Sequence, residues 1–537
     1  MPQEPNIPDG WSEAERWAWG EIRAGRIADF HNRSGQELDP KAPDGWENAQ
    51  QDRLLSSAFL ITIITEVRFR IITPFSGVRI NQASIKEEID LQHARLERQL
   101  WLENCRLNGT VNLFGLQING WLSLEGSWIG GAVNLNGAEL ESHVSFEQVE
   151  IVSEVDLRGA KIGGSLNMDC SHFAGKLNLS GVEVGQYIHM SEQATFQEVN
   201  LAGAKIGRQL IMAGSHFSGK LNLSGVEVGG TLDMVDSHFA GKLTMDGVEV
   251  GQSLFMRSSS FPENEEVGLQ FARIGSSLDL SGATLGALDL TATTIMGELN
   301  LGSAKGYLPP SWVGDSRMIL RNVTVGAIQD REHSWPEQLE LGGLQYSRLG
   351  GYGAEGSADI LNRPGQWFIR WLARDTSFSP QPYTQLASVL HEAGYPSKAN
   401  DIRYAARERA RQEAGKRHVG KPREPLRWFG LSLLQLTIGY GLGSRYFRVL
   451  WWFMGFALIG FLVLLVSLGR SEVDLPTMAL TSLDQVLPIV TLNEAHEDLI
   501  MMNCPRWAIW YFYFQKVVGY ILGGFLGAGL AGLTQKS

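Results

Sequence analysis

An apolar-x-apolar triplet that recurs every eleven residues is the feature that most restricts the fold of this 537-residue chain. Within each unit, positions 1, 3, 6 and 8 are apolar or small, as in VDLRGAKIGGS from Val155. A constant step over so long a stretch predicts a solenoid, in which each unit is stable only against its neighbours. The triplets begin at Val78, Ile89, Leu100, Val111, Leu122, Val133, Val144, Val155, Leu166, Leu177, Ile188, Val199, Leu210, Leu221, Leu232, Leu243 and Leu254.

The composition of the repeat favours strands over helices. An eleven-residue step is also compatible with a right-handed coiled coil. Gly, however, recurs in nearly every unit, and Val, Ile and Thr are frequent, which disfavours helix and suits short strands with turns. The register continues after a two-residue insertion between Pro262 and Glu266, and a later unit is one residue short at Leu288.

Near-identical blocks recur at a larger step, because GKLNLSGVEVG begins at both Gly175 and Gly219 and SHF recurs at steps of 44 and 22 residues. One coil is therefore predicted to contain 22 residues in two halves. The repeat resembles the pentapeptide-repeat family, whose motif is A-(D/N)-L-x-x, with two pentapeptides plus one extra residue per half. The resemblance covers about 78–346 and implies a right-handed quadrilateral β-helix with Leu, Ile and Phe ladders inside.

The predicted β-helix spans 78–350, with about 11 coils at a strand spacing of about 4.8 Å. Acidic residues outnumber basic ones about twofold between positions 81 and 303, so we expect a negative surface. His172, His216 and His238 share one repeat position, and the last two are predicted to stack one coil apart. We interpret them as solvent-facing turn residues, with a metal-binding ladder as the alternative.

The overall charge and the cysteines exclude other classes of protein. A net charge of −12 argues against a general nucleic-acid coat, since phosphate binding needs clustered Lys and Arg. The three cysteines are widely spaced, so neither a disulfide framework nor a zinc site is indicated. The first thirty residues lack a basic segment followed by an apolar one, and we expect no cleavable signal peptide.

Helical segments are predicted on both sides of the repeat. Residues 1–77 are predicted to be a helical N-terminal cap, with a capping box at Ser12 and Glu15 and a second helix at about 46–62. Residues 357–428 are predicted to be a helical connector, part of which is similar to one helical hairpin of the tetratricopeptide kind.

The C-terminal region, 429–537, is predicted to be a membrane module with two spans, at about 449–469 and 507–533. The first stretch is uncharged for 21 residues, and the second is interrupted only by Gln515 and Lys516. The fold class expected is therefore mainly β, a right-handed β-helix of 22-residue coils with helical caps plus a two-span α-helical membrane module.

Charge around the predicted spans gives their orientation. Basic residues precede the first span, whereas the connecting loop is mainly acidic, so the positive-inside rule predicts that both termini are cytoplasmic. We expect the protein in the bacterial inner (plasma) membrane. The basic residues are Lys416, Arg417, Lys421, Arg423, Arg427, Arg445 and Arg448, and the loop acids are Glu472, Asp474, Asp484, Glu494, Glu497 and Asp498.

A basic run before the membrane module is a candidate anion or lipid contact. Attraction to anionic lipid is the favoured interpretation, and a nucleotide or oligonucleotide ligand is the alternative. The candidate residues are Arg403, Arg407, Arg411, Lys416 and Arg417, with Arg409 in the same run.

Catalytic motifs with supporting context are missing from the sequence. Gly351, Gly353 and Gly356 match GxGxxG, but no parallel strand follows them as a dinucleotide site requires. No GxSxG, HExxH or Walker loop is present either. The chain is predicted to be non-enzymatic and to need no cofactor.

The layout of the module is similar to the helix–pore loop–helix unit of tetrameric cation channels. It lacks a TVGYG filter, so potassium selectivity is not implied, and Gly439-Tyr440-Gly441 is expected to be interfacial. The alternative is that 475–505 rests on the outer surface and the helices are only an anchor. The predicted pore or outer-mouth residues are Thr491, Glu494, Glu497, Asp498, Gln515 and Lys516, and the predicted helix-packing residues are Gly519, Gly523 and Gly527.

Two function classes follow from this pattern. The first is an oligomeric channel, most simply a homotetramer, whose cytoplasmic β-helix is a sensor or gate; membrane-depolarising defence effectors against viruses offer an analogy. Its regulator would be a nucleotide, an oligonucleotide or a protein. The second is a membrane-tethered β-helical scaffold for protein–protein interaction.

Overall fold

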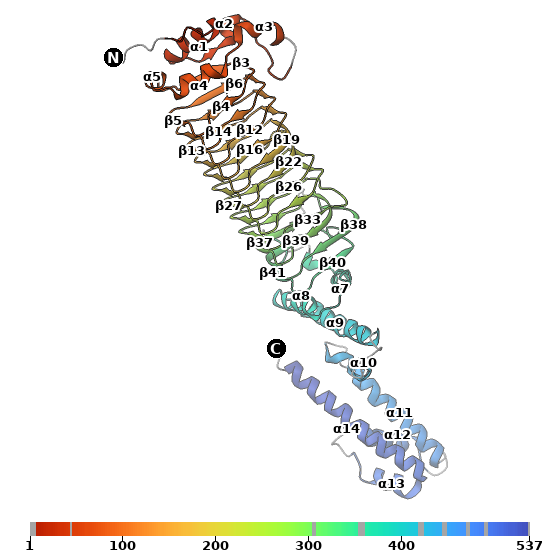
Figure 1. The fold of residues 1–537 in the computed structure, drawn as a ribbon. Coiled ribbons are helices and arrows are strands. Elements are labelled where there is room, and N and C mark those ends of the chain that lie inside the picture. Colours follow the sequence, from red (N-terminus) through yellow and green to blue (C-terminus); the bar gives the residue numbers. More distant parts are fainter. Residues whose placement is uncertain are drawn as a thin grey trace. The chain divides into compact units, whose positions relative to one another are not determined.

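The computed structural model describes residues 7–42, 46–302, 308–352, 360–416, 424–442, 448–468, 473–487 and 492–534. The chain divides into two compact units, one of Met1–Arg363 with Ala373–Ser377 and one of Pro364–Leu372 with Phe378–Ser537. The first unit contains a β-solenoid and the N-terminal helices, and the second is helical (Figure 1).

The solenoid is a parallel β-helix of about twelve coils, close to the eleven expected. Each eleven-residue half forms one short strand at positions 1–2 and another at positions 7–8. Strands of successive coils pair 22 residues apart, as in Leu122↔Val144 and Glu139↔Lys161, which confirms the predicted coil length. The right-handed sense implied by the family resemblance stays a prediction.

The stacked strands form four ladders, numbered here in the order in which the chain meets them within a coil. Ladders 1 and 4 belong to a 23-stranded sheet, and ladders 2 and 3 to an 18-stranded sheet. Ladder 1 contains β1 (Ala28–Asp29), β2 (Val78–Asn81), β6 (Leu100–Glu103), β10 (Leu122–Ser123), β14 (Val144–Ser145), β18 (Leu166–Asn167), β21 (Ile188–His189), β24 (Leu210–Ile211), β28 (Leu232–Asp233), β32 (Leu254–Phe255) and β35 (Leu278–Asp279). Ladder 2 contains β3 (Ser84–Ile85), β7 (Arg106–Leu107), β11 (Trp128–Ile129), β15 (Glu150–Ile151), β25 (His216–Phe217) and β29 (His238–Phe239).

Longer strands join neighbouring ladders where a corner straightens. Ladder 3 contains β4 (Ile89–Asp90), β8 (Val111–Asn112), β12 (Val133–Asn134), β16 (Val155–Asp156), β26 (Leu221–Asn222), β30 (Leu243–Thr244), β33 (Glu266–Gly268) and β40 (Gln338–Glu340). Ladder 4 contains β5 (Arg95–Leu96), β9 (Gln117–Ile118), β13 (Glu139–Leu140), β17 (Lys161–Ile162), β20 (Glu183–Val184), β23 (Lys205–Ile206), β27 (Glu227–Val228), β31 (Glu249–Val250) and β34 (Arg273–Ile274). The strands shared by ladders 2 and 3 are β19 (His172–Asn178), β22 (Thr195–Asn200), β36 (Thr284–Asp289) and β38 (Ser311–Ile319), and those shared by ladders 4 and 1 are β37 (Thr294–Leu301), β39 (Thr324–Asp330) and β41 (Gln345–Leu349).

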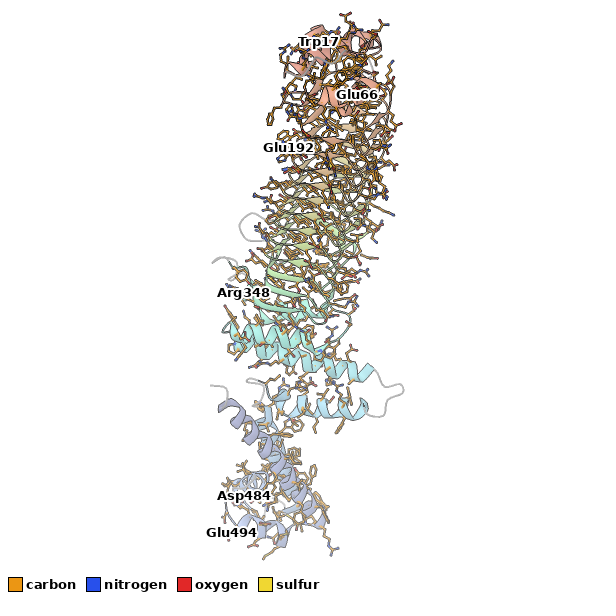
Figure 2. All side chains as sticks on the ribbon, turned by 60° about the vertical axis from the view of Figure 1, so that its left-hand side comes forward. Trp17, Glu66, Glu192, Arg348, Asp484 and Glu494 are labelled. Carbon is orange, nitrogen blue, oxygen red and sulfur yellow. The ribbon has the colours of Figure 1, made fainter. Side chains whose placement is uncertain are left out.

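The core of the solenoid consists of columns of apolar side chains, as the sequence predicted. Positions 1, 3, 6 and 8 of the repeat are buried in nearly every coil. On ladder 2, successive phenylalanine rings stack with centroids 4.9 to 5.3 Å apart, which adds aromatic attraction to the burial of apolar surface. These rings belong to Phe173, Phe196, Phe217, Phe239 and Phe261. Acidic side chains such as Glu192 are exposed on the outside (Figure 2).

One turn position explains why glycine recurs with the repeat. Position 5 has a positive φ, for example 65° at Gly137 and 49° at Asn104, and Gly is the residue that adopts this region without steric cost. The next residue then donates a backbone hydrogen bond to position 3, as Ala138 does to Leu135 over 3.0 Å. This is the geometry of a type II turn, which turns the chain between ladders.

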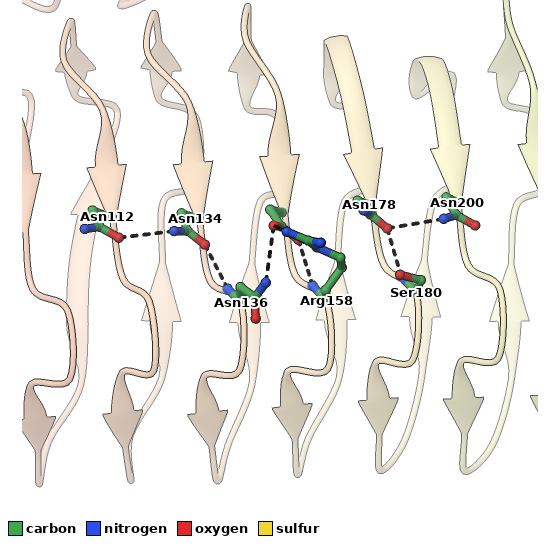
Figure 3. A network of polar contacts seen from close by, with 8 residues as sticks. Asn112, Asn134, Asn136, Arg158, Asn178, Ser180 and Asn200 are labelled. Carbon is green, nitrogen blue, oxygen red and sulfur yellow. Dashed lines mark hydrogen bonds and ion pairs between the residues drawn. The ribbon is translucent and has the colours of Figure 1, made fainter.

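Hydrogen bonds between polar side chains add to the backbone pairing of strands on ladder 3 (Figure 3). Asn134 Nδ2 donates to Asn112 Oδ1 over 3.3 Å, and Asn200 Nδ2 donates to Asn178 Oδ1 over 3.4 Å. The same amide oxygens also accept from the backbone of the following turn, as Asn178 Oδ1 does from Ser180 N. Such ladders reinforce parallel in-register strands.

The N-terminal helices are α1 (Glu13–Arg23), α2 (Phe30–Ser34), α3 (Trp46–Arg53), α4 (Ser57–Thr65) and α5 (Val67–Arg70). The capping box of Ser12 and Glu15 is confirmed. The prediction of one helix at 46–62 is wrong: the chain leaves the helix at Leu54, which bridges to Ser84 of the first coil, and Ser56 caps a new helix. Strand β1 pairs with β2 and so covers the first edge of the sheet.

The helical unit contains three helices of the predicted connector and the C-terminal helices. These are α7 (Gly365–Ala373), α8 (Pro380–Glu392), α9 (Pro396–Lys416), α10 (Glu424–Ile438), the 3₁₀ turn η1 (Gly439–Gly441), α11 (Arg448–Leu468), α12 (Leu475–Val486), α13 (Ala495–Asn503) and α14 (Arg506–Thr534). Helices α8 and α9 pack against each other as a hairpin.

Within the described residues, α11 is the one helix long and apolar enough to cross a membrane by length and composition. The predicted second span falls within α14, a helix of 29 residues. That α14 also crosses a membrane stays a prediction.

The close approach between coils at Gly207 can be tested by substitution. A Cβ there would lie 2.2 Å from the carbonyl oxygen of Gly185 in the preceding coil, and both backbones are fixed by pairing. We expect Gly207→Ala to destabilise the solenoid by about 1–3 kcal/mol, measured by urea unfolding in detergent.

Gly203→Asn is the matched control, because Gly203 has a φ of +66° with open space around it. Asn104 and Asn322 already occupy the equivalent turn position, so Asn at 203 should change stability little. Equal losses in the two variants would contradict the packing argument.

Candidate functional site

Helix α12 folds back along the side of α11 and does not lie across the end of α11. Met478, near the start of α12, packs with Leu464 and Leu468 at the end of α11. Val486, the last residue of α12, packs with Val449 at the beginning of α11. The two helices are therefore antiparallel over most of the apolar length of α11.

Helix α14 completes a three-helix arrangement around α12. Phe512 joins the cluster of Leu464, and Leu522 joins the cluster of Val449, so α14 is also antiparallel to α11. A Cβ on Gly519 of α14 would lie 2.2 Å from the carbonyl oxygen of Val486, which shows how closely α12 approaches α14. Helix α12 thus packs one face against its own chain, while Leu475 and Leu480 are exposed. The alternative in which 475–505 rests on the outer surface of a membrane stays a prediction.

A buried polar contact lies at the centre of this arrangement. Gln515 Nε2 donates to the carbonyl oxygen of Ser482 over 3.0 Å, and Ser482 Oγ donates to the carbonyl oxygen of Ala457 over 2.6 Å. Gln515 and Ser482 are both 0% exposed. Gln515, predicted to prefer a polar cavity, therefore faces the polar side of α12.

Part of this polar core is unsatisfied. Gln515 Oε1 and Thr481 Oγ1 are buried without a hydrogen-bond partner among the residues that the structure describes. Gln485 is also buried. Unpaired polar atoms are costly in apolar surroundings, so their presence on α12 and α14 calls for a function or for further partners.

Asp484, which is labelled in Figure 2, joins the end of α12 to the start of α13. Its Oδ1 accepts from Leu492 N over 2.7 Å, and its Oδ2 lies 3.0 Å from His496 Nδ1. Asp484 and His496 are 7% and 8% exposed. The sequence analysis counted Asp484 only among the loop acids. In the structure, its side chain joins the end of α12 to the start of α13.

The predicted outer-mouth acids lie at and within α13. Glu494, Glu497 and Asp498 are all exposed, and Glu494 is labelled in Figure 2. Glu497 has a basic partner from the following helix, because its Oε1 lies 3.5 Å from Lys516 Nζ. The helical turn of α13 brings these two residues together across 19 positions of sequence. Thr491 lies outside the described residues.

The three predicted helix-packing glycines have different surroundings. Gly519 packs within the chain against α12, whereas a Cβ on Gly527 would meet nothing within 4 Å. Gly523 is half-buried. Of the three glycines, Gly527 therefore has open space beside it, where a neighbouring copy of the chain would fit.

The candidate lipid or anion contacts belong to α9 and the segment after it. Arg411 forms an ion pair with Glu408 over 2.5 Å, and Arg403 donates to Asn400 over 3.3 Å, while Arg407 is exposed. The side chain of Lys416 and all of Arg417 lie outside the described residues.

Two further candidates from the sequence are the Gly-Tyr-Gly segment and the GxGxxG match. Tyr440 of η1 donates to Glu408 over 3.3 Å, so Gly439-Tyr440-Gly441 packs on α9; its interfacial position stays a prediction. Gly351 follows β41, and Gly353 and Gly356 lie outside the described residues.

One prediction for the repeated histidines concerned the stacking of two of them. His216 and His238 stack with ring centroids 4.6 Å apart, which confirms the predicted contact. His172 instead faces Thr195, because the turn before β22 contains one additional residue. No group of three or more His, Cys, Asp or Glu suited to a metal ion occurs in the described part of the chain.

Ladder 4 of the solenoid carries an open groove of about 1420 Å³ that the sequence did not predict. Its floor is a column of glycines, where a Cβ would strike the backbone of the preceding coil. Charges of both signs line one wall and pair across coils, as Lys205 does with Glu227 at 3.5 Å and Arg273 with Glu249 at 2.7 Å. The floor glycines are Gly163, Gly185, Gly207, Gly229, Gly251 and Gly275.

The polar side chains of α12 are the functional candidates that sequence reasoning missed. Thr481, Ser482 and Gln485 recur at the spacing of one helix face, which is the signal that could have found them. No protein-family model, curated protein sequence or solved structure matches this chain.

Gly460 permits the close contact between α11 and α12, which leads to a test. A Cβ on Gly460 would lie 2.1 Å from Ser482 Oγ and 2.5 Å from Gln515 Oε1. Gly460→Ala should therefore displace α12 and lower the stability of the helical unit by about 1–3 kcal/mol, measured by thermal unfolding in detergent.

Gly455→Ala is the control, since it lies on the same helix with nothing within 4 Å of its Cβ. It should leave the unfolding temperature unchanged or raise it slightly, because Ala favours helix. A larger loss at Gly455 than at Gly460 would refute the packing described above.

Proposed function

We propose that this protein is an oligomeric membrane channel whose helical unit conducts ions and whose solenoid is a cytoplasmic regulatory domain. The observation that carries the proposal is α12, a short helix folded back between α11 and α14 with its buried polar face along an apolar helix. An anchor needs only the two long helices.

The physical argument is the cost of polar groups at membrane depth. Non-helical backbone and polar side chains are tolerated there where protein buries them or where they line a water-filled cavity. Thr481 and Gln515 keep buried oxygen atoms without partners in the described part of one chain. Water or ions in an assembled pore would satisfy these atoms.

Assembly follows from the number of helices. Two long helices and one short helix per chain cannot enclose a conduit, so several copies are required, and a cyclic tetramer is the simplest arrangement. Gly527 and many exposed apolar side chains of α11, such as Trp451 and Val466, offer surface for this contact or for lipid. Both termini are proposed to lie in the cytoplasm of a bacterial cell, with the basic residues near the inner leaflet.

The selectivity proposed is for cations. Exposed Glu494, Glu497 and Asp498 would surround an outer mouth and concentrate cations there. Lys516 opposes this field less than its charge suggests, because it is paired with Glu497.

The second candidate function is a membrane-tethered scaffold, favoured by the groove on ladder 4. Its length over many coils would suit an extended partner. Under this function the solenoid binds and the helical unit only anchors, with no conduction. A depolarising defence role remains an analogy that belongs to the channel alone.

Ion flux in liposomes separates the two candidates. Purified protein should release potassium from loaded vesicles, and replacing both Gly523 and Gly527 with Leu should abolish assembly and flux. Gly524→Leu, at a position as open as Gly527 but off the four-residue glycine ridge, should retain both. Inserted protein without flux would exclude the channel and leave the scaffold.

Reversal potentials under a salt gradient test the selectivity. Glu497→Gln should reduce cation preference more than Asp498→Asn does, because it removes an acid and frees Lys516. Lys516→Gln should increase cation preference. Unchanged potentials in all three variants would place these residues outside the conduction path.

A further inference from the structure

A second hollow lies on ladder 1 of the solenoid, in its N-terminal half. It has a volume of about 500 Å³, within the range of small-molecule sites. The second residue of each ladder 1 strand is large above and below the hollow, at Trp101 and Asn167, but is serine in the two coils between, at Ser123 and Ser145. The hollow therefore results from two missing side chains in an otherwise filled column.

One wall of the hollow is aromatic. The rings of Trp101 and Trp121 have centroids 6.3 Å apart, and Trp121 lies 5.3 Å from His143. Trp121 is 47% exposed, an unusual position for a large apolar side chain on a regular solenoid. The guanidinium of Arg79 already lies 5.4 Å from the centre of the Trp101 ring, so this column accepts a cation at one end.

The opposite wall is a row of carboxylates, one per coil. Glu103, Glu125 and Glu147 all line the hollow and are half-buried. Neutral groups donate to two of them: Ser123 Oγ to Glu103 over 2.7 Å and Asn167 Nδ2 to Glu147 over 2.8 Å.

Among the described residues no ion pair joins Lys, Arg or His to these three carboxylates; His189, which also lines the hollow, lies 3.6 Å from Asp169 instead. Burial raises the pKa of Glu125, and the Glu103 carboxylate adds to the rise. Burial likewise raises the pKa of Glu147, with repulsion from Glu125 adding to it. The folded solenoid thus holds negative charges together without a compensating cation.

The spacing of this row points to a particular ligand. Successive coils are about 4.8 Å apart, which places the carboxylates at that interval along the solenoid axis. An extended chain advances about 3.5 Å over three bonds, so the four bonds between the nitrogens of an aminopropyl unit span about 4.7 Å. The methylene groups between such nitrogens would pack on the indole rings.

We propose that the hollow bounded by Trp101, Trp121 and the row Glu103–Glu125–Glu147 binds a linear aliphatic polyamine, with successive ammonium groups against successive carboxylates. The aromatic wall favours an organic cation over a hydrated metal ion, since cation–π attraction and methylene packing both need an alkylammonium. This binding site does not depend on whether the helical unit conducts ions.

Calorimetric titration of the full-length protein in detergent with spermidine tests the proposal. One spermidine should bind per chain, and Glu125→Gln should weaken it about tenfold, as expected for losing a charge-assisted hydrogen bond. Trp121→Ala should weaken it several-fold. Glu183→Gln on ladder 4 removes an exposed acid outside the hollow and should leave the affinity unchanged.

A series of amines and a competing metal complete the experiment. Affinity should rise from butylamine to putrescine to spermidine, and Mg²⁺ at equal charge concentration should not displace spermidine. Circular dichroism shows whether each variant keeps the solenoid. The proposal is overturned by equal affinity in Glu125→Gln and Glu183→Gln, by affinity that does not rise along the series, or by binding of a lysine-rich peptide without binding of spermidine.

Discussion

The parallel hydrogen-bonded register between coils is the constraint on which the rest of the solenoid depends. Through most of the solenoid each strand pairs with residues 22 positions away, and one residue of slip would turn the buried side chains outward. The left-handed turn at position 5 and the close approach at Gly207 both serve this register. Glycine is therefore frequent here because of backbone geometry in a strand-rich fold.

The same register decides how function can be placed on the solenoid. Because every repeat position forms a column, a side-chain type that recurs produces a row with a spacing of about 4.8 Å. The phenylalanine stack uses this spacing for packing, and the asparagine ladder uses it for hydrogen bonds. The carboxylates of Glu103, Glu125 and Glu147 lie in such a row without a cation, and their mutual repulsion makes the row a receptor for repeated positive charge.

The helical unit follows a different principle, the satisfaction of polar groups within an apolar bundle. Gly460 and Gly519 allow α12 to approach α11 and α14 closely enough for Gln515 to reach the backbone of Ser482. The side chain of Asp484 holds the start of α13 against the end of α12. These contacts fix a polar helix beside a long apolar one, and the proposed conduction is the function that gives this arrangement a purpose.

The sequence by itself determined the solenoid, its 22-residue coil, the inward phenylalanines and the helical segments, because local period and composition dictate these features. It also identified Gln515, Lys516 and the acids of 494–498 as unusual. Tertiary structure alone decided that Lys516 pairs with Glu497, that α12 folds back between two helices, and that serines at 123 and 145 open a hollow beside two tryptophans. Such contacts join residues of different helices or coils, so their chemistry depends on how those elements pack and cannot be read from local sequence.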